Sequence, residues 1–126
     1  MDLVNKSKYN IILGSGSSRR KELLGMTGIN FSVMSIPVDE SFPDSLQGTE
    51  ISEYIVKNKS DAFNKLIKEN EIIITADTLV WYKNKCLGKP KDKKEAKNML
   101  KLFAGKSHDV ITSVGFLTIS NFKILT

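Results

Sequence analysis

Runs of apolar residues alternate with helical stretches along the chain and predict a series of short strands. The apolar, β-branched run at 9–13 predicts a first strand that is buried on both faces. Further strands are predicted at 31–36, 72–82 and 108–119. Turn residues at 83–84 and 120–121 then predict two hairpins, with return strands at 85–87 and from Phe122 onward.

Three amphipathic helices are predicted between these strands. The first is capped by Ser17 or Ser18, ends at Gly25 or Gly28, and turns three side chains inward: Leu23, Leu24 and Met26. The second is capped by Thr49 and buries Ile51, Tyr54, Ile55, Ala62, Phe63, Leu66 and Ile67. The third opens on the pair Asp92 and Glu95, ends at Gly105, and buries Ala96, Met99, Leu100 and Phe103.

This alternation of strands and helices predicts an α/β fold, and 126 residues suit one domain spanning 1–126. A hydrophobic content of 40% and a charged content of 26% are typical of a globular protein. No apolar run has the length of a membrane span or a signal peptide, so we expect no membrane partner. Cys86 is the only cysteine, which excludes an internal disulfide and fits a cytoplasmic location.

The stretch 11–24 has the outline of a phosphate site, because a strand runs into a Gly/Ser turn and then a helix start. Backbone N–H groups at such a turn favour an anion. Arg19 and Arg20 are the only arginines among 19 basic residues, and guanidinium groups bind phosphate bidentately where lysine cannot. The alternative is a solvated first turn that carries two arginines by chance.

The net charge of +5 allows a polyanionic partner. The lysines are spread along the chain without a block of like charges, so nucleic-acid binding has little support beyond the charge itself. A nucleoside triphosphate would satisfy the same positive excess.

Two acids follow predicted strands and are candidates for metal binding and catalysis. Glu40 lies in the loop after the second strand, and Asp77 interrupts the isoleucine run at 72–76. Ligands of α/β sheets bind beyond the carboxyl ends of strands, so both acids are expected near the phosphate loop. Carboxylates beside phosphate suit Mg²⁺, and one of them can activate water. The alternatives are a turn-capping aspartate and an exposed loop glutamate.

Three further residues have chemistry worth weighing. Lys59 lies on the apolar side of the long helix, and Lys89 is held between Gly88 and Pro90. Each is a candidate for binding an anion, although either lysine alone is more simply a solvated side chain. His108 is the only histidine, and we favour a structural hydrogen-bonding role for it.

Two other nucleotide motifs are absent. Gly14 and Gly16, with Asp39 downstream, partly match a dinucleotide-binding fingerprint. The third glycine position of that fingerprint is occupied by Arg19, which excludes the close helix packing it requires. A Walker-type loop is excluded because no Gly-Lys-Ser/Thr follows at the required spacing.

Taken together, these motifs resemble the Maf family of nucleoside triphosphate pyrophosphatases, which have the inosine-triphosphatase-like fold also called Ham1-type. Two small departures are Gly14 and Ser18, where the family usually has Ala and Pro. The blocks that carry the resemblance follow one another in family order: 13–24, 38–40, Lys59, 76–80, 88–92, 108–110 and 112–114.

The resemblance implies a mixed twisted sheet flanked by helices, and hydrolysis of a nucleotide between its α and β phosphates with Mg²⁺ or Mn²⁺. It implies that Asp77 accepts the proton of water and that Glu40 joins it at the metal. The phosphates would be held by Ser15, Arg19, Lys59 and Lys89. Arg20 and Thr78 match positions linked to base choice in the dTTP/UTP branch. A homodimer is also implied.

Two other expectations accompany this one. A nucleotide-binding regulator linked to septum formation is the alternative function. The family's C-terminal third has no counterpart here, and we expect the strand at 108–119 to leave an unpaired apolar edge. The chain by itself is then expected to self-associate and to hydrolyse nucleotides poorly.

Overall fold

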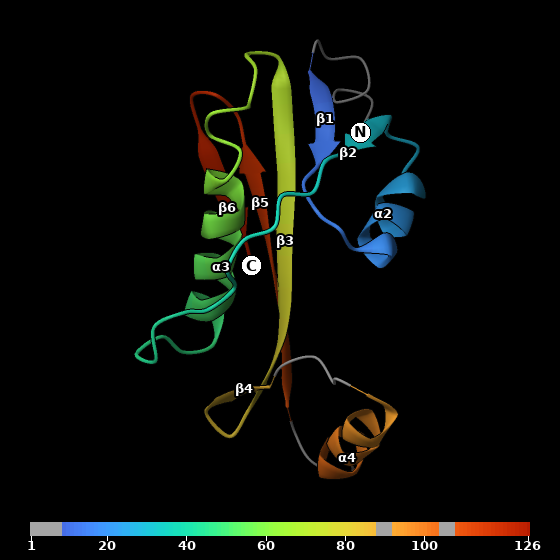
Figure 1. The fold of residues 1–126 in the computed structure, drawn as a ribbon, viewed down its shortest axis with the longest axis vertical. Helices are drawn as coiled ribbons and strands as arrows, with labels where there is room; N and C mark the ends of the chain where they lie inside the picture. The colour runs from blue at the N-terminus through green and yellow to red at the C-terminus, as the bar shows by residue number, and fades with distance from the viewer. Residues whose placement is uncertain (1–8, 88–91, 104–107) are drawn as a thin grey trace.

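The computed structural model describes residues 9–87, 92–103 and 108–126, and its described part is built on one mixed sheet (Figure 1). The strands pair in the order β2-β1-β3-β5-β6, and β4 pairs with the far end of β3. The strands are β1 (Asn10–Leu13), β2 (Phe31–Val33), β3 (Glu71–Tyr82), β4 (Lys85–Leu87), β5 (Asp109–Leu117) and β6 (Phe122–Leu125). The helices are α2 (Ser18–Gly25), α3 (Thr49–Asp61) and α4 (Lys93–Phe103).

Strand β3 is the centre of the sheet and, at 12 residues, its longest strand. β1 and β2 lie parallel on one side of it, while β5 and β6 follow antiparallel on the other. Its first half is rich in isoleucine, whose branched side chain fits a pleated, buried surface. The α/β class and the mixed, twisted sheet predicted from the sequence are confirmed.

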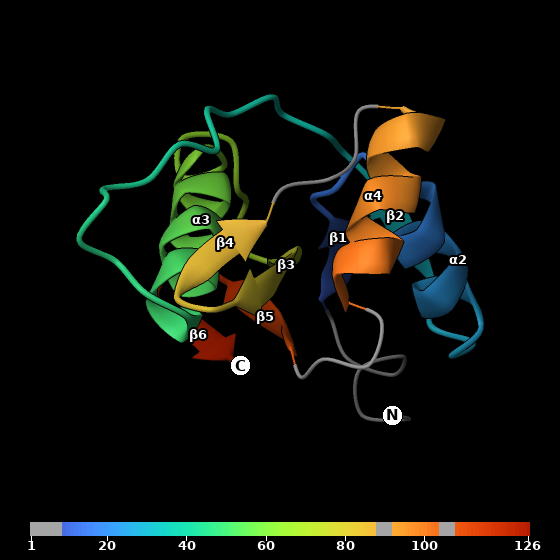
Figure 2. The same ribbon diagram turned by 90° about the horizontal axis from the view of Figure 1, so that it is seen from below.

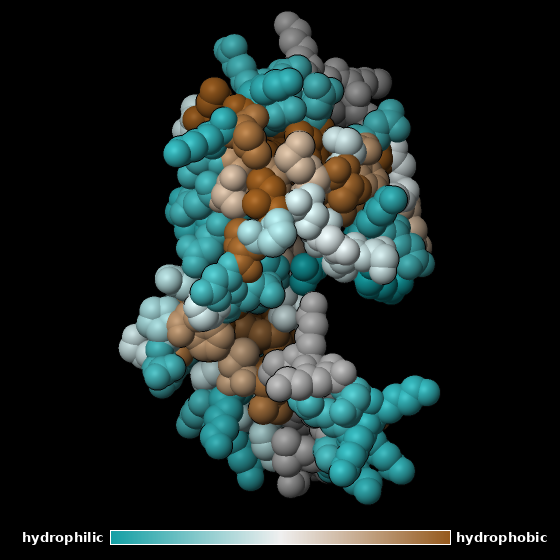
Figure 3. Space-filling model, in the orientation of Figure 1, coloured by the Kyte–Doolittle hydropathy of each residue, from teal (hydrophilic) through white to brown (hydrophobic). Residues whose placement is uncertain are grey.

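Helix α3 covers one face of β3 and β5, as the two ribbon views show (Figures 1 and 2). The core between helix and sheet has two clusters, one around Phe63 and Ile73 and one around Ile51 and Leu79. Helix α4 lies at the far end of the β3–β5 ladder (Figure 1). The surface is hollowed between the body of the molecule and α4, whose visible face is hydrophilic (Figure 3).

The short connections behave as predicted. Ser17 caps α2 by accepting a hydrogen bond from the N–H of Arg20 at 3.2 Å, and α2 ends at Gly25. Lys83 and Asn84 both have positive φ, 48° and 62°, as the tight turn of a two-residue hairpin requires. Asp92 accepts from the N–H of Glu95 at 2.8 Å, which confirms the helix start there. In the described part of the chain, no helix has the length and apolar character needed to cross a bilayer.

The inward face predicted for the first helix is wrong. Leu23 is 47% exposed and Met26 75% exposed, and Leu24 is only half-buried. Helix α2 lies beside β2 at the edge of the sheet rather than over its middle (Figure 1), and of the three side chains predicted to face inward Leu24 is the one that lies beside sheet residues. There it borders an apolar cleft of about 290 Å³ that also includes Ile11 and Phe116.

The long second helix is shorter than predicted and buries a different stripe. Gly48, with φ 53°, takes the N-cap position in place of Thr49, and turns replace the helix after Asp61. Tyr54 and Leu66 are exposed at 39% and 56%, because the inward stripe is completed by Val56 and by two fully buried serines, Ser52 and Ser60. Ile51, Ile55 and Phe63 are buried as predicted.

Three remaining expectations also change. The second strand stops at Val33, three residues earlier than predicted. Strand β5 is not an unpaired edge throughout, since β6 pairs with its residues 114–117. Leu100, predicted to be buried, is 72% exposed. The side chains of Met99 and Phe103, and all of Gly105, lie outside the described residues.

Candidate active site

The site begins where β1 ends and β3 continues. The two strands pair up to Leu13 and Ile74, and the N–H of Gly14 makes a last bond of 2.8 Å to the carbonyl of Ile74. Two residues further along β3, the carbonyl of Ala76 points toward the same side, past the end of β1. It accepts hydrogen bonds from Lys59 Nζ at 3.0 Å and from Arg20 Nη1 at 3.1 Å. Cations from α3 and α2 therefore meet at one carbonyl.

The Gly14–Ser17 loop lies beside this point and is held closely to the core. A Cβ on Gly14 would lie 2.9 Å from the ring of Phe63, so a larger residue would require the ring or the loop to shift. Ser15 Oγ accepts from the N–H of Ser17 at 3.1 Å, and Ser17 then caps α2. The loop leads directly into the N-terminus of an eight-residue helix, whose dipole favours an anion.

A cleft of about 180 Å³ opens between this loop and the segment 35–38. Its walls include Ser15, Phe63 and two side chains of opposite charge, Glu40 and Lys59. The cleft therefore joins the Gly/Ser turn to one of the predicted acids and one of the predicted lysines.

Lys59 brings the two predicted acids together. Its Nζ lies 2.9 Å from Glu40 Oε1 and 3.8 Å from Asp77 Oδ1. The Lys59 and Asp77 side chains are only 18% and 11% exposed, whereas that of Glu40 is 57% exposed. Because Glu40 is more exposed, water screens its attraction to the ammonium more strongly than it screens the attraction of Asp77. The structure thus brings Glu40, Asp77 and Lys59 together, while their roles at a phosphate site stay a prediction.

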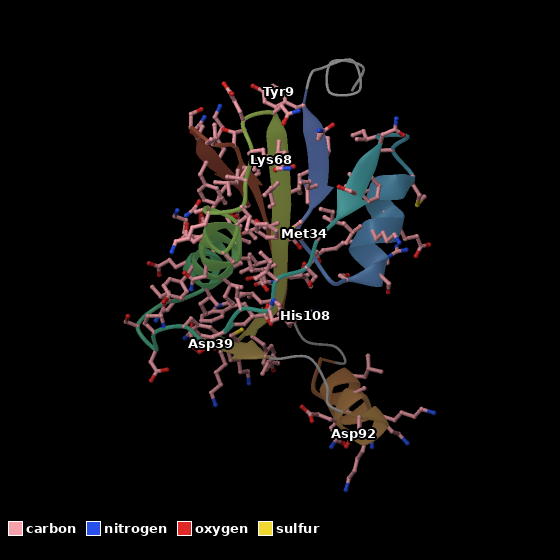
Figure 4. The ribbon with its side chains drawn as sticks, turned by 45° about the horizontal axis from the view of Figure 1, so that its top comes forward. Tyr9, Met34, Asp39, Lys68, Asp92 and His108 are labelled. Carbon is pink, nitrogen blue, oxygen red and sulfur yellow. The ribbon has the colours of Figure 1, made fainter. Side chains whose placement is uncertain are left out.

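The loop that carries Glu40 crosses the sheet from β2 toward α3, with Asp39 on it (Figure 4). Asp39 accepts a hydrogen bond of 2.9 Å from the N–H of Ser41, which closes a turn around Glu40. This backbone hydrogen bond lowers the pKa of Asp39, and the Ser41 hydroxyl adds to the effect. The turn thus keeps Glu40 directed at Lys59.

A second polar group lies on the opposite face of β3. Arg20 donates to Thr78 Oγ1 at 3.3 Å from one nitrogen while it holds the Ala76 carbonyl with another. Thr78 in turn pairs with Thr112 on β5 at 3.0 Å. The two positions that the resemblance links to base choice are thus in direct contact.

Other predicted residues are not at this point. Arg19 lies on the outer side of α2, 69% exposed, and makes a 3.7 Å ion pair with Glu22. Lys89 lies outside the described residues. His108 is exposed at the start of β5 (Figure 4).

Sequence reasoning missed the hydroxyl pairs beneath the site. Ser60 and Thr75 contact each other at 2.7 Å, and Ser52 contacts Ser113 at 2.6 Å, all four fully buried. The available signal was the spacing of Ser52 and Ser60, which are eight residues apart and hence on the same helix face.

Glu40 and Asp77 are the candidate ligands for a divalent cation. Within 9–87, 92–103 and 108–126 no group of three or more His, Cys, Asp or Glu side chains converges. Two carboxylates do converge on one ammonium group, and Mg²⁺ typically takes one or two carboxylates together with phosphate oxygens and water. Glu40 and Asp77 therefore fit such a cation when a phosphate chain supplies the remaining oxygens.

Cys86 provides a chemical reporter of the charge on Asp77. Burial raises the pKa of the Cys86 thiol, and the negative charge of Asp77 raises it further. We expect alkylation by iodoacetamide near pH 8 to be slower than for a free thiol, because the thiolate is the nucleophile. In an Asp77→Asn variant the alkylation profile is expected to move to lower pH. An unchanged profile would show that the Asp77 charge does not reach Cys86.

Comparison with known proteins agrees with the family resemblance of the sequence. A family model described as Maf-like protein matches residues 10–124. A dTTP/UTP pyrophosphatase of Bacteroides fragilis is 47% identical over 117 residues, which cover 92% of this chain and 61% of the relative. One from Flavobacterium johnsoniae is 42% identical over 118 residues, with 94% and 61% covered. The chain thus spans about three fifths of the length of these relatives.

Two solved structures share the fold. The Staphylococcus aureus Ham1 protein superposes with a TM-score of 0.59 at 14% identity, covering 91% of this chain and 67% of that one. A nucleoside-triphosphatase described as a dITP/XTP pyrophosphatase, from Mycobacterium abscessus, gives 0.53 at 11% identity, with 92% and 70% covered. At this identity the likeness concerns the fold alone, and it confirms the Ham1-type architecture.

Proposed function

The chain belongs to the Maf family, and on that basis we propose that it is the larger part of a nucleoside triphosphate pyrophosphatase that maintains the nucleotide pool. The proposed reaction converts dTTP or UTP to the monophosphate and pyrophosphate. The observation that carries this proposal is Lys59, whose ammonium joins Glu40 and Asp77 beside the Gly14–Ser17 loop. A polyanion gains from two acids at its binding site only when a cation joins them.

In this proposal the phosphates occupy the cleft, where Ser15, Arg19, Lys59 and Lys89 hold them. Ser15 and Lys59 already line that cleft. Arg19 must turn inward from its ion pair with Glu22, and an exposed pair of this kind is worth only about 0–1 kcal/mol. A phosphate group would also satisfy Lys59 and Arg20 in place of the Ala76 carbonyl.

Asp77 is proposed as the base that takes a proton from the attacking water, with Glu40 beside it. Its low exposure excludes bulk water from the carboxylate, while Lys59 limits the cost of its charge. Glu40 and Asp77 would hold Mg²⁺ or Mn²⁺. When bound, such a cation neutralises phosphate charge and polarises a phosphoryl oxygen.

Arg20 and Thr78 are proposed to select the base. They contact each other on the face of β3 opposite Asp77, and the relatives named dTTP/UTP pyrophosphatase support a pyrimidine substrate.

We also propose a domain organisation, a location and an oligomeric state for the whole protein. Residues 1–126 are proposed to form part of a single Maf-like domain. A cytoplasmic location is proposed because Cys86 is the only cysteine of the sequence and cannot form an internal disulfide. A homodimer is proposed on the family resemblance alone.

The test measures pyrophosphate release over a panel of nucleoside triphosphates with Mg²⁺ and with Mn²⁺. It uses the 126-residue chain and a chimera in which residues 1–124 are followed by the remaining C-terminal part of the Bacteroides fragilis relative. We expect the chimera to release pyrophosphate from dTTP or UTP and to stop when EDTA removes the metal. Release of inorganic phosphate instead would contradict the proposal, because it would mean cleavage at the γ position.

Arg20→Lys in the chimera is expected to lower kcat/KM for dTTP about tenfold, or about 1.4 kcal/mol. The guanidinium binds Ala76 and Thr78 with two nitrogens at once, whereas one ammonium cannot reproduce that fork. The control is Lys21→Arg, which exchanges the same two side-chain types at the neighbouring exposed position, away from Thr78. Equal kinetics for Arg20→Lys and the unaltered chimera would remove Arg20 from the binding site.

A further inference from the structure

We infer that Ser60 and Thr75, a fully buried hydroxyl pair between α3 and β3, are positioning residues that set where Lys59 stands relative to Asp77. The inference concerns the arrangement of the side chains and rests on the proposed function only for its effect on turnover. Neither residue touches the cleft, and both have 0% exposure.

Contacts between α3 and β3 follow the same order along the two elements. Ser60 contacts Thr75 at 2.7 Å, while the preceding residue, Lys59, bonds the carbonyl of Ala76 at 3.0 Å and lies 3.8 Å from Asp77. Consecutive residues of the helix thus meet consecutive residues of the strand. A shift of α3 along β3 would break the hydroxyl pair and move the ammonium from both acids.

Helix α3 and the sheet approach each other closely at this point. Gly115 lies opposite Thr75 on β5, and a Cβ there would be 2.6 Å from Val56 Cγ1 and 2.8 Å from Thr75 Oγ1. The absence of a side chain at Gly115 therefore allows α3 to approach until the two hydroxyls meet. A buried hydroxyl that loses its partner is costly, so the pair favours one position of the helix over neighbouring ones.

The hydroxyl pair is directional, unlike the apolar contacts beside it. Apolar side chains pack without a preferred direction, so Val56 and Ile55 alone would tolerate small shifts of the helix. A hydrogen bond of 2.7 Å requires both distance and angle. Lys59 has a long, flexible side chain, and its placement between Glu40 and Asp77 depends on the position of the Lys59 Cα on the helix.

The test compares conservative variants of the 126-residue chain. Ser60→Ala and Thr75→Val remove a hydroxyl each, while Thr75→Ser keeps the hydroxyl and removes a methyl group. Ile51→Val is the matched control for stability, because Ile51 is a buried residue of the same helix, 1% exposed, and lies eight residues before Lys59. All four are expected to lower the melting temperature by several degrees.

The deciding readout is the ¹H–¹⁵N resonance of the Lys59 ammonium, assigned with Lys59→Arg, because ion pairing slows its proton exchange. We expect this resonance to shift or to be lost in Ser60→Ala and Thr75→Val, and to be retained in Thr75→Ser and Ile51→Val. The Lys57 ammonium, paired with Asp61 at 2.7 Å on the exposed side of α3, is the internal reference and stays unchanged.

The inference is overturned if Ser60→Ala and Thr75→Val leave the Lys59 resonance in place, or if Ile51→Val and Thr75→Ser disturb it equally. Turnover of dTTP is measured on the same substitutions in the chimera. In Ser60→Ala and Thr75→Val, kcat should fall about tenfold with KM nearly unchanged, since misplacement by 1 Å can cost up to about 10²-fold. If the unaltered chimera shows no turnover, the ammonium resonance still decides the positioning role, and the proposed function fails separately.

Discussion

Replacing Asp77 by Asn in the chimera is expected to lower kcat for dTTP by about 10²–10⁴-fold, the range typical of general acid–base catalysis. The amide has nearly the same shape but cannot accept the proton of water at neutral pH. The Asp77 side chain is only 11% exposed and its Oδ1 lies 3.8 Å from Lys59 Nζ, so no bulk solvent base replaces it. Substrate affinity, measured by equilibrium binding, is expected to change only a few-fold.

Asp39→Asn is the matched control, since it makes the same chemical change on the same side of the fold. Asp39 is exposed and uses an oxygen to accept the N–H of Ser41, a role that an amide oxygen retains. We expect this variant to keep nearly full activity. If Asp77→Asn kept more than about a tenth of kcat, the base would have to be sought at Glu40.

Adding a methyl group at Gly115 is expected to destabilise the fold by about 1–3 kcal/mol, the usual cost of overpacking a core. A Cβ there would lie 2.6 Å from Val56, 2.8 Å from Thr75 and 3.0 Å from Phe122. The branched Val56 has a stiff χ1 and cannot turn away freely. Urea unfolding of Gly115→Ala measures the loss directly.

The control adds the same methyl group at Gly25, where nothing lies within 4 Å of the new Cβ. Gly25 is the last residue of α2, so Ala should be neutral or stabilising there by up to about 1 kcal/mol. Equal unfolding midpoints for the two variants would show that α3 does not approach the sheet as closely as the structure has it.

The strands and the acids of the site were predictable because their signals are local. The isoleucine run of β3 and the turn at Lys83–Asn84 each identify one kind of backbone. Asp77 stood out because an acid is unusual directly after an isoleucine run. Its predicted place at a strand end is wrong, since it lies in the middle of β3, and it comes close to the Gly/Ser loop because the neighbouring strand β1 ends at Leu13.

The packing of the helices was less predictable, because it depends on neighbours distant in sequence. The spacing of Leu23 and Met26 fits an inward face, yet α2 lies beside the sheet edge with little to cover them. Ser52 and Ser60 read as polar positions, yet each finds a hydroxyl partner on a strand and is buried. Only the fold shows that such a partner exists.

The central claim, cleavage between the α and β phosphates, is tested most directly with two analogues of dTTP incubated with the chimera and Mg²⁺. One carries a methylene bridge between the β and γ phosphates, and the other between the α and β phosphates. The account predicts that the β,γ-bridged analogue is cleaved to dTMP while the α,β-bridged analogue is not. Cleavage of the α,β-bridged analogue with release of inorganic phosphate would contradict it.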